Sequence, residues 1–192
     1  MTKTENFEKI EVQSQDELRA WLTAHHTQQD SIWLVTYKKS TPDKYLSTGA
    51  VLDELLCFGW VDGIRRKLDE HRTMQLIGPR RKQHWSKTYK DRVSKLRRDG
   101  LMMPAGEAAV AASKESGLWS FLDDVDALIT PPDLQKKLET DKSAIDFFNA
   151  INPSSKRFAL RWLKLAKTDK TRQARIQKLF DLSLKGEKLP GS

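Results

Sequence analysis

Residues 57–63 (CFGWVDG) decide the fold class, because they join a helical pattern to a strand pattern. Before them, apolar residues repeat at helical spacing from about Thr48 to Phe58, and Gly59 stands where a glycine commonly ends a helix. After them, residues 60–68 and 72–77 have the composition of two strands separated by three polar residues. The stretch therefore predicts a helix that runs directly into an antiparallel hairpin.

The residues on either side of this hairpin predict further helices and one more strand. Ser14 and Glu17 form the pattern of a capping box, and the apolar residues after them follow helical spacing to about His25. Residues 31–38 are rich in β-branched and aromatic side chains, which favours a strand. Residues 86–100 predict another helix, which ends near a glycine. Together these elements predict a small, mainly antiparallel sheet with flanking helices.

The second half of the chain is almost wholly helical in its pattern. Helices are predicted from Pro104 to Gly117, after Pro131, and over residues 141–151, 155–167 and 169–185. The expected fold is therefore α+β, with residues 1–103 as a mixed α/β half and residues 104–192 as a helical half. We expect the helical half to pack on the first as one compact unit.

Composition indicates an intracellular globular protein. The chain has 192 residues, of which 38% are hydrophobic and 31% charged. No apolar run approaches the roughly 18 residues of a membrane span, so no transmembrane segment is expected. The first nine residues are polar and lack the apolar core of a secretory signal. We therefore expect a cytoplasmic location, and the single cysteine fits a reducing compartment.

Cys57 and the histidines are the first candidates for chemistry. Cys57 invites comparison with a thiol nucleophile that has His71 or His84 as its base, but the end of a helix disfavours a thiolate. We therefore interpret it as a buried structural residue. Four histidines and one cysteine do not have the spacing of a zinc site, so no metal, cofactor or catalytic residue is predicted.

A cluster of cations and aromatic residues predicts a ligand site instead. In residues 79–87, Lys and Arg lie near Trp85 in sequence and next to the start of a predicted helix, where backbone N–H groups favour anions. Asp62 is expected to pair with Arg65, Arg80 or Arg81 and to orient an arginine toward the anion, or else to stabilise a turn as part of an internal ion pair. The predicted ligand-binding residues are Trp60, Asp62, Arg80, Arg81, Trp85, Ser86 and Lys87. The alternative interpretation is a structural knot of capping and stacking residues.

Two basic segments carry a second hypothesis, a nucleic-acid-binding module. Residues 61–103 hold 13 Lys or Arg against 5 Asp or Glu, and residues 155–192 hold 11 against 3. Basic surfaces attract phosphates, although pairing with acidic residues such as Asp124 within the fold explains the same charges. The residues predicted for this alternative are Arg157, Arg161, Lys164, Arg172 and Arg175.

Several motifs occur in an order that is informative in itself. They are CFGWVDG at 57–63, Pro79-Arg80-Arg81, Trp85-Ser86-Lys87, residues 100–106, Gly117-Leu118-Trp119, Ala166-Lys167, Thr171-Arg172 and Arg175-Ile176. Over nearly the whole chain they resemble the YdeI/OmpD-associated family, whose members are labelled bacteriocin-protection proteins. The family pattern has Ser or Thr where this chain has Gly78, and a small or apolar residue where it has His84. If these positions line a pocket, the resemblance implies a different ligand here.

What the resemblance implies about function is a bacteriocin-protection or stress-associated protein of unestablished biochemistry. Association with an outer-membrane protein is implied by the family label alone. The residues favour a protein that binds an anionic small molecule or peptide without catalysis. The nucleic-acid-binding module stays the alternative, and an enzyme of unknown reaction is a third hypothesis.

Overall fold

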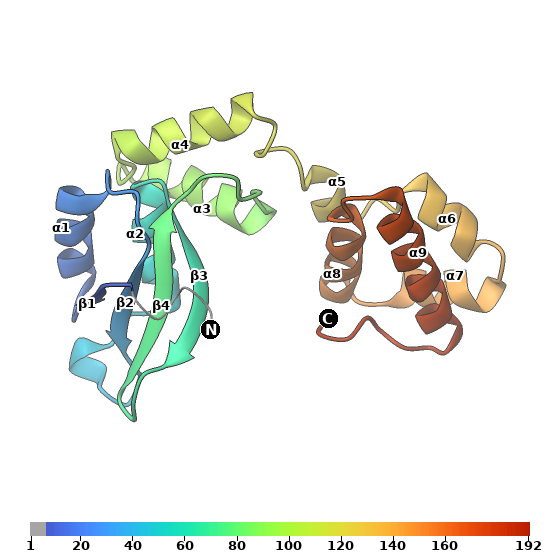
Figure 1. Cartoon of the computed structure of the whole chain (residues 1–192), viewed down its shortest axis with the longest axis horizontal. Coiled ribbons are helices and arrows are strands. Elements are labelled where there is room, and N and C mark those ends of the chain that lie inside the picture. Colours follow the sequence, from blue (N-terminus) through green and yellow to red (C-terminus); the bar gives the residue numbers. More distant parts are fainter. Residues whose placement is uncertain (1–6) are drawn as a thin grey trace. The chain divides into compact units, whose positions relative to one another are not determined.

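The computed structural model describes residues 7–192. They form two compact units that divide between Ser120 and Phe121, and each unit is described by itself. The expected mixed α/β half followed by a helical half is present (Figure 1). The division lies later than the expected boundary after residue 103, because helix α4 (Pro104–Glu115) belongs to the first unit.

The first unit combines a four-stranded sheet with helices. Its strands follow the order β1-β2-β4-β3, with β1 parallel to β2 and the other neighbours antiparallel. The elements are β1 (Lys9–Glu11), α1 (Gln15–His25), β2 (Ile32–Tyr37), the 3₁₀ helix η1 (Pro42–Lys44), α2 (Thr48–Cys57), β3 (Trp60–Lys67), β4 (Arg72–Pro79), α3 (Lys87–Arg98) and α4. The predicted hairpin is confirmed as β3 and β4, whereas β1 was not predicted.

The hairpin contains one irregularity that is important for the site. Asp62 pairs with Ile77 and Arg65 pairs with Gln75, so β3 has one more residue than β4 over this interval. This is a β-bulge, which bends and twists the strand locally. Gly63 lies in the bulge, where an added Cβ would be 3.2 Å from the Leu76 carbonyl oxygen.

The core of the first unit lies between the sheet and its helices. Leu18 and Leu22 of α1 and Leu55 of α2 pack in one cluster with Leu34 of β2 and Ile77 of β4. Figure 1 shows α1 and α2 on the same side of the strands. The alternation of side chains along β2 and β4 places these residues on the face that the helices cover.

Glycines allow α2 and α4 to approach closely. Gly59 follows α2 with φ +72°, the left-handed conformation expected of a residue that ends a helix. An added Cβ on Gly106 would be 2.3 Å from the Cys57 carbonyl oxygen, so α4 lies directly against the end of α2. This contact explains why α4 is part of the first unit.

The second unit is helical throughout the residues described. It consists of α5 (Asp123–Asp126), α6 (Pro132–Leu138), α7 (Lys142–Ala150), α8 (Pro153–Lys164) and α9 (Asp169–Leu184). Asp141 caps α7 as expected, since its side chain accepts from two backbone N–H groups. The helices bury a separate core that includes Leu138, Phe148, Leu163 and Leu179. Among residues 7–192, no helix has both the length and the apolar composition needed to cross a membrane.

Candidate functional site

The two tryptophans of the predicted site are core residues. Trp60 and Trp85 are each 1% exposed. Trp60 donates from Nε1 to the His26 carbonyl oxygen at 3.0 Å, which ties the start of β3 to the end of α1. The centroid of the Trp85 ring lies 4.9 Å from that of Trp119. Neither ring lines the pocket at the end of the sheet, so at these two positions the structure has a packed core.

Arg80 packs into the same aromatic cluster. Its guanidinium carbon lies 3.9 Å from the centroid of the Trp85 ring and 5.4 Å from that of Tyr89. Burial lowers the pKa of the Arg80 guanidinium to about 10. The electrostatic interactions with Tyr89 and Asp62 raise this pKa, but by less than burial lowers it. Its backbone N–H donates to the Gly59 carbonyl oxygen at 2.9 Å. Arg80 therefore joins the end of the hairpin to α3 through a cation–π contact.

Asp62 is held by two neutral donors. Its carboxylate accepts from the Tyr89 hydroxyl at 2.6 Å and from Gln75 Nε2 at 3.2 Å. The Gln75 oxygen in turn accepts from Arg65 at 2.7 Å. Asp62 therefore does not pair directly with Arg65, although pairing with an arginine was predicted. Gln75 lies between them and forms a hydrogen bond to each side chain.

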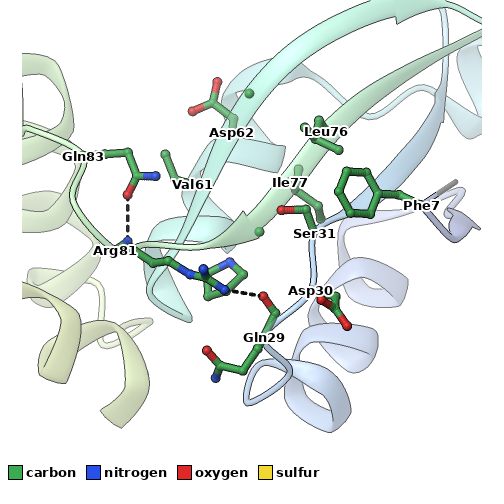
Figure 2. A pocket seen from close by; sticks show the side chains of 13 residues that line it. Phe7, Gln29, Asp30, Ser31, Val61, Asp62, Leu76, Ile77, Arg81 and Gln83 are labelled. Atoms are coloured by element: carbon green, nitrogen blue, oxygen red, sulfur yellow. Dashed lines mark hydrogen bonds between the residues drawn. The ribbon is translucent and has the colours of Figure 1, made fainter. Parts of the chain in front are cut away.

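A pocket of about 390 Å³ lies at the end of the sheet where β4 leaves it. Its size is within the range of small-molecule sites, about 300–1,000 Å³. Figure 2 shows side chains from the segment before β2, from β3 and from the segment after β4 around it. The lining residues are Phe7, Gln29, Asp30, Ser31, Val61, Asp62, Gly63, Leu76, Ile77, Gly78, Pro79, Arg81 and Gln83.

Arg81 supplies the positive charge of this pocket. It donates from Nη2 to the Gln29 carbonyl oxygen at 2.7 Å, and its backbone N–H donates to Gln83 Oε1 at 2.7 Å (Figure 2). Both partners are neutral, and among the residues described no carboxylate contacts its guanidinium. These bonds hold Arg81 at the pocket. They do not neutralise its positive charge, because both partners are uncharged.

Ser86 and Lys87 lie outside the pocket lining. Ser86 precedes α3 at the N-cap position without a side-chain capping bond, and the Lys87 ammonium pairs with Asp91 at 3.0 Å. The structure therefore divides the seven predicted residues. Asp62 and Arg81 line the pocket, whereas Trp60, Arg80 and Trp85 pack inside.

Sequence reasoning missed most of the pocket lining. Gln29, Ser31 and Gln83 come from connecting segments without a motif, and Gly78 was noted only as a departure from a family pattern. An added Cβ on Gly78 would be 2.5 Å from Ser31 Oγ, which indicates how closely these two pocket residues approach. A signal was available at Gly63, a pocket residue within the predicted strand 60–68, because a glycine inside a strand pattern is typical of a close approach.

Comparison with known families covers both units. Residues 10–109 match the sequence model of a domain of unknown function (DUF8412). Residues 127–186 match the model of the bacteriocin-protection, YdeI or OmpD-associated family. The chain belongs to the DUF8412 family and carries a YdeI/OmpD-associated domain. Neither a curated protein nor a solved structure matches it.

The two matches divide the motifs. The YdeI/OmpD-associated match confirms the resemblance and contains the motifs around Lys167, Arg172 and Arg175. The segment 57–63 and the pocket residues lie within or close to the DUF8412 match. The pocket therefore lies almost wholly in the part of the chain that matches DUF8412, and the label that mentions bacteriocin protection comes from the match over residues 127–186 of the helical unit.

Several cations of the second unit are engaged within that unit. Lys164 pairs with Asp124 at 2.5 Å, and Arg172 makes two bonds to Asp133 at 2.6 and 2.8 Å. Arg175 donates to the Trp162 carbonyl oxygen. The expected internal pairing is thus present at Lys164. Arg157 and Arg161 contact no carboxylate among the residues described.

Cys57, which is buried, and the four histidines all lie within the DUF8412 match. Burial raises the pKa of the Cys57 thiol to about 11, and the nearby Glu54 charge acts in the same direction while Arg19 opposes it. The His25 ring stacks on Trp21 with 4.7 Å between centroids. In the part of the chain that is described, no group of three His, Cys, Asp or Glu residues has metal-binding geometry.

Proposed function

We propose that the DUF8412 domain binds a small anionic molecule, or the carboxylate of a peptide, in the pocket lined by Arg81. The observation that carries this proposal is the guanidinium of Arg81, which lies at the pocket without a carboxylate partner among the described residues. An arginine whose charge is not paired is well suited to a planar carboxylate, because its N–H groups form a rigid fork. The chain as a whole would then act in bacteriocin protection as a binding protein.

The other lining residues limit the charge of the ligand. Asp30 and Asp62 line the same pocket, so a ligand with two negative charges meets more repulsion than a ligand with one. Ser31 and Gln83 add neutral hydrogen-bonding groups, and Phe7 and Leu76 add apolar surface. The arrangement therefore favours a singly charged carboxylate with an apolar body over a phosphate.

Binding without catalysis fits the chemistry of the lining. Of the described residues around the pocket, none is a histidine, a cysteine or a lysine. Acyl and phosphoryl transfer usually need a positioned base or an activated nucleophile, and the proposed function needs neither.

Titration calorimetry with propionate and with inorganic phosphate tests the proposal. We expect propionate to bind the full-length protein more tightly than phosphate, and Arg81→Gln to weaken propionate binding about tenfold, the usual value of a charge-assisted bond. Lys82→Gln is the matched control, because it removes the neighbouring exposed charge, which does not line the pocket. Equal affinities of the Arg81→Gln and Lys82→Gln proteins would contradict the proposal.

A further inference from the structure

The outer face of helix α8 carries large apolar side chains that the core does not use. Phe158 is 41% exposed and Leu165, the residue that caps α8, is 39% exposed. Arg161 and the half-buried Trp162 lie between them in sequence. Residues three, four and seven positions apart share one side of a helix, so these four form a continuous strip. We call Phe158, Arg161, Trp162 and Leu165 the outer strip of α8.

The inner side of the same helix already supplies the core contacts. Ala159, Leu160 and Leu163 are each at most 2% exposed and pack in the cluster with Leu179. A helix that packs through one side normally presents polar residues on the other. Trp162 packs partly against that cluster, whereas Phe158 and Leu165 belong neither to it nor to the residues packed against it, so the core does not explain their size and exposure.

Cations stand on both sides of the outer strip. From α8 itself, Arg157 lies beside the strip and Arg161 is a member of it. From α9, the Arg175 guanidinium carbon lies 4.7 Å and the Lys178 nitrogen 6.0 Å from the centroid of the Trp162 ring. Arginine and tryptophan are the residues most enriched at the energetic centres of protein interfaces.

These charges differ from the paired cations elsewhere in the unit. Lys164 and Arg172 each hold an aspartate of the same unit within 2.6 Å. No carboxylate contacts Arg157, Arg161 or Lys178 within residues 7–192 as described. The strip thus has an apolar centre and a cationic border whose charges are available to a partner.

We propose that the outer strip of α8 binds an acidic amphipathic segment of a partner protein. Apolar side chains of the partner would cover Phe158 and Leu165, while its carboxylates would meet the cations at the border. A second copy of the same strip is disfavoured, because its border would bring like charges together.

Two other occupants fit the strip less well. Nucleic acid gains from stacking on successive exposed aromatic faces, whereas the strip offers it only Phe158, because Leu165 is aliphatic and cations already lie over the Trp162 ring. An interfacial membrane helix needs a wide apolar face, whereas the larger apolar side of α8 is used by the core.

Fluorescence anisotropy of a labelled synthetic peptide tests the proposal on the full-length protein. The probe is a helix-forming peptide of Glu and Leu whose leucines lie at helical spacing, and a scrambled peptide of equal composition is its control. We expect the patterned peptide to bind, the scrambled peptide to bind at least tenfold more weakly, and added salt to weaken both. Vesicles containing an anionic lipid and a single-stranded oligonucleotide are tested in parallel.

Variants locate the binding. Phe158→Ser and Arg161→Glu should each raise the dissociation constant of the patterned peptide about tenfold or more, with unchanged melting temperatures. Lys136→Glu, an exposed cation on α6, is the matched control and should leave binding unchanged. Absence of peptide binding, equal binding of both peptides, or insensitivity to Phe158→Ser would overturn the proposal. So would a preference of the strip for vesicles or for the oligonucleotide.

Discussion

The guanidinium of Arg80 lies 3.9 Å from the centre of the Trp85 ring, and each side chain keeps one buried nitrogen, Arg80 Nε and Trp85 Nε1, without a hydrogen-bond partner in the described structure. Unpartnered buried donors carry a desolvation penalty. The contact between Arg80 and Trp85 is therefore stabilised by packing and cation–π attraction, whereas the two unpartnered nitrogens destabilise the folded state.

Substitutions at these two residues should have opposite effects on stability. Trp85→Ala removes a ring that is 1% exposed and should lower the free energy of unfolding by about 3–5 kcal/mol. Arg80→Met keeps much of the apolar contact and removes the buried charge, so it should raise that free energy by about 1 kcal/mol. Urea denaturation at pH 7 measures both. A large loss of stability in Arg80→Met would mean that the charge itself stabilises the fold.

The effect of Arg80 should also depend on pH. Burial lowers the pKa of its guanidinium to about 10, well below the ordinary value that holds in the unfolded chain. Between these values the unfolded state binds more protons, so stability rises with pH there. The buried Arg80 charge therefore destabilises the folded protein most at neutral pH, and this effect decreases as the pH rises past 10. Arg80→Met should therefore exceed the wild type in free energy of unfolding by less at pH 10.5 than at pH 7. A difference in free energy of unfolding that stays constant over this range would contradict the destabilisation by the Arg80 charge.

Local signals of the sequence predicted the elements around the hairpin well. Gly59 ends α2 with a positive φ, and the polar residues 69–71 separate β3 from β4, because both features depend on the chain within a few residues. Strand β1 was missed, since its three residues are stabilised by parallel pairing with the distant β2. Short strands of this kind carry no periodicity of their own.

The candidate site was predicted only in part for a related reason. Arg80 and Arg81 are neighbours in sequence, yet one packs on Trp85 and the other lines the pocket. Composition cannot distinguish two adjacent arginines whose directions depend on strand twist and on the loop after β4. Likewise, a tryptophan that fills a core and one that forms a pocket wall have the same local pattern.

Gly106 should be required for the contact between α4 and α2. Gly106→Ala would place a methyl group 2.3 Å from the Cys57 carbonyl oxygen, so the helices must separate, and we expect a loss of about 1–3 kcal/mol or more. Gly49→Ala is the matched control inside α2, because the nearest atom to its added methyl is the end of the flexible Arg92 side chain at 3.4 Å. It should stabilise the protein by about 0.5–1 kcal/mol through helix propensity. Thermal unfolding of both variants measures the contrast.

Cys57 should be inert in the native protein. Its thiol pKa of about 11 results mainly from burial, so almost no thiolate exists at pH 8. Native protein should react with iodoacetamide far more slowly than protein unfolded in urea, as followed by mass spectrometry. Rapid alkylation of the native protein at pH 8 would show that the thiol is accessible and ionised.

The most direct test of the account is a ¹H–¹⁵N NMR titration of the full-length protein with propionate. The proposed function predicts that the largest chemical-shift changes fall on backbone amides of the pocket, at residues 29–31, 61–63, 78, 81 and 83, and that a ligand concentration about tenfold higher is needed to produce the same changes in Arg81→Gln. Changes confined to the cationic helices α8 and α9, or the same changes in Arg81→Gln at an unchanged ligand concentration, would contradict it.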